Sequence, residues 1–206
     1  QALRDHLDQG WLRFVSDETP TESDPVTNHQ DTLMTGHIGG SSDITKEKIA
    51  LNTNKVIRHL ACELTNNGSE TPNDYYINLV NEHLQPEQGW RATGNTVTRE
   101  LKILLTDVFD IAKINFEKIT HDLGVTFTIV DAKDEIADES DLIASIEKHR
   151  PNILMIRTKT IITETVAEVL ISDSNFYYLL RPGVGIDNIY PGMKKLSSHG
   201  VKIINE

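Results

Sequence analysis

Short apolar runs alternate with stretches of helical periodicity in the second half of the chain. The runs are rich in leucine, isoleucine and valine and are too short for helices, so they predict buried strands at residues 101–107, 125–130, 152–156, 176–180 and 201–204. Apolar positions at helical spacing between them predict helices at residues 112–123, 141–149, 163–170 and 193–199. This alternation predicts an α/β fold with a parallel sheet over residues 100–206.

The first 99 residues have a different pattern. Residues 16–31 read as a polar loop, residues 32–34 as a short buried strand, and residues 43–65 as an amphipathic helix. Residues 66–99 have turn-forming residues at both ends and one helix signal, at residues 74–84. We interpret this stretch as a linker, and an insertion packed on the main domain is the alternative.

Composition narrows the classes of partner. The chain has 206 residues, of which 20 are basic and 31 acidic, so its net charge is −11 at pH 7. That balance argues against nucleic acid or an anionic membrane surface as the partner. No apolar run approaches the roughly 20 residues that span a bilayer, and no signal-peptide pattern opens the chain.

Two single residues bear on the origin of the chain. Cys62 is the one cysteine, so no internal disulfide can form, which favours a reducing, cytoplasmic location. The chain begins at Gln1 rather than methionine. We therefore expect a processed product or a piece of a longer parent chain. No metal site is predicted.

Four motifs in residues 100–206 carry a family resemblance. They are Leu-Leu-Thr-Asp (104–107), Ile-Arg-Thr-Lys-Thr (156–160), Arg-Pro-Gly-Val-Gly-Ile-Asp-Asn-Ile (181–189) and His-Gly-Val-Lys-Ile-Ile-Asn (199–205). With them the stretch resembles the substrate-binding half of the D-isomer-specific 2-hydroxyacid dehydrogenases, closest to the D-3-phosphoglycerate dehydrogenases of serine biosynthesis. The resemblance implies a flavodoxin-like substrate-binding domain, completed by the helix at residues 43–65.

The start of the chain resembles the C-terminal end of the same family, through Asp-Glu-Thr-Pro-Thr-Glu (17–22) and Leu-Met-Thr-Gly-His-Ile-Gly-Gly (33–40). The two halves therefore stand in reversed order, as in a circular permutation. Residues 1–42 are interpreted as the remnant of a dinucleotide-binding domain, most of which is missing. No Gly-x-Gly-x-x-Gly occurs, because Asn188 stands where the third glycine would follow Gly183 and Gly185.

The resemblance also implies which residues would carry the chemistry. His37 would exchange the proton at the C2 oxygen of a 2-hydroxy acid, and Glu22 would pair with it. Asp17 would contact the nicotinamide of NAD, the cofactor of the family. A surface histidine and loop carboxylates are the competing interpretation of these residues.

The substrate would be a small anionic 2-hydroxy or 2-keto acid. The loop Gly183-Val184-Gly185 can present backbone N–H groups to its carboxylate, or can be a plain strand-to-helix turn. Arg157 and Lys159 end a predicted strand, where ligands of open α/β sheets bind, and by resemblance would face the anion. Exposed basic residues at a strand end are the alternative.

Two functional hypotheses follow. The first is an incomplete or permuted oxidoreductase that performs no turnover as this chain alone, because the dinucleotide motif and the family's substrate arginine are missing. The second is a non-catalytic α/β module that binds a small anion or mediates assembly. A homodimer is a further expectation of either hypothesis.

Overall fold

The computed structural model describes two separate parts of the chain. Contacts divide it into a unit at residues 1–48 and a unit at residues 49–206. The residues described are 14–16, 32–34, 43–65, 78–79, 84, 86, 89–91, 99–109, 114–183 and 185–205. In the first unit, β1 (Phe14–Ser16) pairs in parallel with β2 (Thr32–Met34). The strand predicted at residues 32–34 is present, whereas the strand at residues 14–16 was not predicted.

The second unit is built on a parallel sheet. Its strands are β4 (Glu100–Leu105), β5 (Thr126–Asp131), β6 (Ile153–Met155), β7 (Tyr178–Arg181) and β8 (Lys202–Asn205). They lie in the order β5-β4-β6-β7-β8 and all pair in parallel. This is the 2-1-3-4-5 order of flavodoxin-like folds, so the predicted fold class is confirmed.

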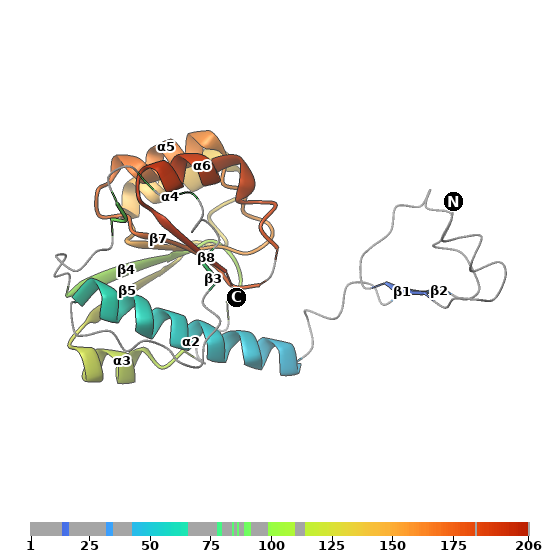
Figure 1. Cartoon of the computed structure of the whole chain (residues 1–206), viewed down its shortest axis with the longest axis horizontal. Coiled ribbons are helices and arrows are strands. Elements are labelled where there is room, and N and C mark those ends of the chain that lie inside the picture. Colours follow the sequence, from blue (N-terminus) through green and yellow to red (C-terminus); the bar gives the residue numbers. More distant parts are fainter. Residues whose placement is uncertain are drawn as a thin grey trace. The chain divides into compact units, whose positions relative to one another are not determined.

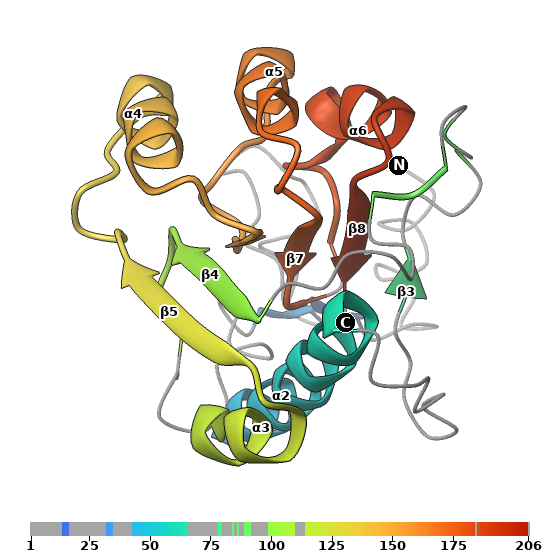
Figure 2. The same cartoon turned by 90° about the vertical axis from the view of Figure 1, so that its left-hand side faces the viewer.

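Helices cover both faces of this sheet (Figures 1 and 2). One face carries α4 (Glu139–His149), α5 (Glu164–Ser172) and α6 (Tyr190–Ser198). The other carries α3 (Phe116–Leu123) and the part of α2 (Asp43–Thr65) that lies in this unit. Side-chain caps set several helix starts, since Asn115, Asp138 and Thr163 each accept a hydrogen bond from a first-turn N–H.

The handedness of the crossovers explains why α2 is needed. The chain moves one way across the sheet from β4 to β5 and the other way from β5 through β8. Right-handed connections then place α3 alone on one face and the other three crossover helices on the opposite face. The apolar stripe of α2 covers what α3 leaves open, and Ile57, Leu60 and Leu64 are fully buried there. The predicted helix from the N-terminal segment therefore completes the domain.

A polar cluster also fastens α2 to the sheet. The Tyr178 hydroxyl on β7 donates to Glu63 Oε2 at 2.5 Å, and Lys202 Nζ on β8 lies 2.9 Å from both carboxylate oxygens of Glu63. Three elements distant in sequence thus share one carboxylate. The cluster fixes the position of α2 along the strands and the area over which the helix contacts them.

The stretch at residues 66–99 makes defined contacts with the sheet unit where it is described. The helix predicted at residues 74–84 is wrong at Asn78–Leu79, which form β3 and pair antiparallel with β8. A strand of two residues forms only by pairing with its partner strand, so the local sequence pattern does not predict it. Farther on, Arg91 donates from its side chain to the backbone carbonyls of Ile171, Asp173, Phe176 and His199.

The role of α2 can be tested by one truncation in its buried stripe. Leu60 is fully buried, so Leu60→Ala should lower the free energy of unfolding by about 2–5 kcal/mol through the lost contacts and the cavity. Leu51 is on the same helix and 55% exposed, so Leu51→Ala should change it by less than about 0.5 kcal/mol. Urea unfolding measures both. Equal losses in the two variants would contradict the burial of α2.

The polar cluster predicts a pH dependence. Burial, and then the Glu63 carboxylate, raise the pKa of the Tyr178 hydroxyl well above its ordinary value of 10.0. The stability that this shift contributes is therefore present below about pH 10 and is lost as the pH rises through the folded-state value. We expect unfolding free energy measured by urea titration to fall less steeply above about pH 10 in Tyr178→Phe than in the wild type. Tyr190→Phe, at a 68% exposed position, should keep the wild-type slope.

Candidate functional site

The carboxyl edge of the sheet has a crevice where the strand order reverses. The loop after β4 leads to α3 on one face, while the loop after β6 leads to α5 on the other. Ligands of open α/β sheets bind outside the carboxyl ends of the strands at such a point. A hollow of about 490 Å³ lies there, and its lining includes Thr106, Asp107, Lys133, Lys159 and Thr160.

Arg181 ends β7 at the same edge and is only 5% exposed. Its Nε is buried and has no hydrogen-bond partner within the described part of the chain. The guanidinium lies against the loop that follows, because a Cβ added at Gly183 would come within 2.7 Å of Nη1 and one at Gly185 within 3.2 Å of Nη2. Gly183 also has a φ of +120°, which L side chains rarely adopt. Glycine at both positions is what lets the arginine sit beside the backbone.

A second positive charge lies close to Arg181. Burial lowers the pKa of the Arg181 guanidinium below its ordinary value, and the like charge of Arg157 lowers it further, while Asp187 acts in the opposite direction. Neither arginine forms an ion pair with a carboxylate among the residues described. An anion between them would relieve both the desolvation and the repulsion.

Hydrogen bonds hold the loops of this edge together. Arg157 Nη1 donates to the Val108 carbonyl at 3.3 Å, which links the loops after β6 and β4. Asn188 Nδ2 donates to the carbonyls of Arg157 and Thr160, both at 2.6 Å, which links the loop after β7 to that after β6. The hydroxyl groups of Thr106 and Thr160 lie 2.7 Å apart. The position of Arg157 is therefore set by hydrogen bonds between the loops, while Arg181 is placed by the end of β7.

The structure places the predicted site residues unevenly. Arg157, Lys159, Gly183 and Gly185 lie in the two loops that follow the adjacent strands β6 and β7, at one edge of the sheet. Four predicted residues lie outside the described residues: Asp17, Glu22, His37 and Val184. Arg181 was not predicted as a site residue. The available signal was a strand that ends in arginine, with only Pro182 between that arginine and a Gly-x-Gly.

Comparisons with protein-family models, with curated proteins and with solved structures find no match for this chain. Among the described side chains no group of three or more His, Cys, Asp or Glu residues is arranged to hold a metal ion. In the same part of the chain, no helix is both long and apolar enough to cross a bilayer.

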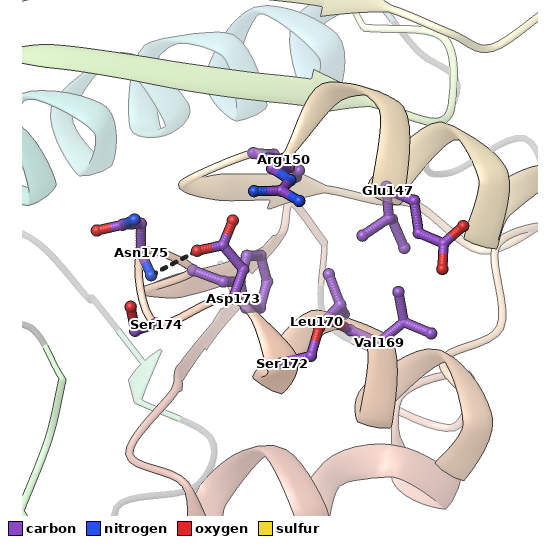
Figure 3. A pocket seen from close by; sticks show the side chains of 11 residues that line it. Glu147, Arg150, Val169, Leu170, Ser172, Asp173, Ser174 and Asn175 are labelled. Atoms are coloured by element: carbon purple, nitrogen blue, oxygen red, sulfur yellow. Dashed lines mark hydrogen bonds between the residues drawn. The ribbon is translucent and has the colours of Figure 1, made fainter.

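A second hollow, of about 510 Å³, lies near the amino ends of β6 and β7, between the ends of α4 and α5 (Figure 3). Arg150 and Glu147 stand on its α4 side, and Asp173 lies opposite, accepting a hydrogen bond from the Asn175 N–H at 2.9 Å. None of the predicted site residues lines it. The carboxyl edge, where the arginines meet, is therefore the candidate site.

The bonded loops give a stability prediction. Asn188→Ala leaves the carbonyls of Arg157 and Thr160 without their donor, so the free energy of unfolding should fall by about 1–3 kcal/mol. Lys194→Ala, at an exposed position of the adjacent helix α6, should change it by less than about 0.5 kcal/mol. Thermal and urea unfolding check both. An Asn188→Ala protein as stable as the wild type would mean that the amide does not tie the loops.

Proposed function

We propose that residues 49–206 form a substrate-binding domain of the 2-hydroxyacid dehydrogenase type, which binds a small anionic 2-hydroxy or 2-keto acid. The observation that carries the proposal is the pair of guanidinium groups, Arg181 and Arg157, at the carboxyl ends of adjacent parallel strands. A buried arginine without a carboxylate partner costs free energy that a bound anion recovers.

Each group in the site has a role that its position supports. Arg181 presents its guanidinium beside Gly183 and Gly185, so an anion can meet side-chain and backbone N–H groups together. Arg157 adds a second charge from the neighbouring loop. Lys159 lines the hollow at the crevice and is exposed, which suits a point contact to a distal phosphate or carboxylate. A ligand with two anionic ends would engage both groups of contacts.

The described residues do not fit a dinucleotide. Asn188 replaces the third glycine of the phosphate-binding motif, and its amide is engaged by two carbonyls. NAD thus enters the proposal only through the family resemblance. No hydride step is derived from this domain, and in the proposal His37, Glu22 and Asp17 would supply proton exchange and the nicotinamide contact.

The binding prediction uses 3-phosphoglycerate and inorganic phosphate as probes. Arg181→Met and Arg157→Met each remove charge-assisted hydrogen bonds of about 1.5–3 kcal/mol, so affinity for 3-phosphoglycerate should fall roughly ten- to hundredfold. Lys194→Met, on the exposed side of α6, should bind as the wild type does. Calorimetric titration measures the affinity. Amide shifts in NMR spectra show whether residues near Arg157 and Gly183 respond.

Two results would contradict the proposal. Unchanged affinity in both arginine variants would show that the two arginines do not bind the anion. Amide shifts confined to other parts of the chain would show that the anion binds elsewhere. A steady-state assay with NAD and 3-phosphoglycerate separates the dehydrogenase from the non-catalytic module. We expect no turnover by this chain alone, and turnover abolished by His37→Ala would overturn that expectation.

A further inference from the structure

Among the described strands, β5 lies at one edge of the sheet and pairs only with β4 (Figure 2). We propose that this edge is a homodimer interface, in which β5 of one copy pairs antiparallel with β5 of a second copy about a two-fold axis. The inference is independent of the anion site, which lies across the sheet's carboxyl edge. Three properties of β5 support it: the direction in which its backbone N–H and C=O groups point, the burial of its side chains, and its sequence.

Hydrogen bonds at the two ends of β5 show which of its backbone groups face β4. The Thr126 N–H donates to the Arg99 carbonyl and the Ala132 N–H donates to the Leu105 carbonyl, so both point toward β4. Because successive residues of a strand point their backbone groups to opposite sides, Thr128 and Val130 also face β4. Phe127, Ile129 and Asp131 therefore direct their N–H and C=O groups outward. No described residue bonds to these outward groups.

Burial sets β5 apart from the strands inside the sheet. Every residue of β6 and β7 is buried, whereas the four central residues of β5, Phe127 to Val130, are only half-buried. These residues contribute to both faces of the sheet, because Phe127 and Ile129 pack on one hydrophobic cluster and Val130 on the other. A further strand paired with the free edge of β5 would cover its half-buried side chains on both faces of the sheet.

The first five residues of β5 carry none of the features that normally blunt an edge strand. Residues 126–130, Thr-Phe-Thr-Ile-Val, contain no proline, glycine or charge, and the charge in the strand is Asp131 at its end. The six-residue strand pairs with β4 in unbroken register. The opposite edge is different, because β3 is only two residues long. Of the two edges, β5 is the one that can template another strand.

The strand is self-complementary, which is why the partner is a second copy. In a two-fold pair centred on Thr128, Phe127 faces Ile129 of the other copy, and each such pair exchanges both main-chain hydrogen bonds. Thr128 then faces Thr128 in a non-hydrogen-bonded pair, where the side chains are closest. Asp131 faces Val125, so no like charges meet.

Analytical ultracentrifugation of the full chain over a range of concentrations tests the interface. We expect a concentration-dependent dimer that Thr128→Lys weakens at least tenfold, because two lysines would meet on the axis, and that Thr128→Val retains. A chain that stays monomeric up to about 200 µM, where a weak dimer with a micromolar Kd would be populated, overturns the proposal. A dimer unaffected by Thr128→Lys does so too.

Cross-linking tests the register even if the lysine variant is unstable. With Cys62 replaced by serine, Thr128→Cys should give a covalent dimer on mild oxidation, because the Cα atoms of a central non-hydrogen-bonded pair lie about 4.5 Å apart. Thr126→Cys is the matched control, since its counterpart lies far from the axis and should not cross-link. Equal cross-linking in the two variants, or none in either, would overturn the proposed pairing.

Discussion

A parallel sheet must be covered on both faces, and this constraint governs the arrangement of the larger unit. Right-handed crossovers supply three helices to one face but only α3 to the other. The helix α2, which precedes the whole sheet in the chain, fills the remaining place with a fully buried apolar stripe. Without it, residues of β4, β6 and β7 would face water. A helix that precedes every strand of this sheet in the chain is thus a structural part of the sheet.

The same topology creates the candidate site. Because the strand order reverses between β4 and β6, the loops that follow them diverge and leave a crevice at the carboxyl edge. Arg181 and Arg157 are brought to this edge by adjacent strands, and the glycine loop after β7 lets the Arg181 guanidinium lie against the backbone. The site combines a desolvated charge with loops fixed by Asn188. Those are the elements that a small anion requires.

Local patterns predicted most of the second unit because its strands are apolar and its helices have capping residues. The described helix α3 begins at Phe116, later than the 112 expected from periodicity, because Asn115 caps it. The helix expected at residues 74–84 failed at β3, which depends on pairing with β8. Arg181 was missed for a similar reason: its burial and its proximity to Arg157 are tertiary, and in sequence it is one more arginine at a strand end.

We propose that an anion binds between Arg181 and Arg157. The most direct measurement is the side-chain Nε–Hε NMR signal of Arg181 during titration with 3-phosphoglycerate, because this group has no hydrogen-bond partner among the described residues. We expect a saturable shift of that signal, which in Arg157→Met should need roughly ten- to hundredfold more ligand. A signal that stays unchanged while other residues of the chain respond to the ligand would contradict it.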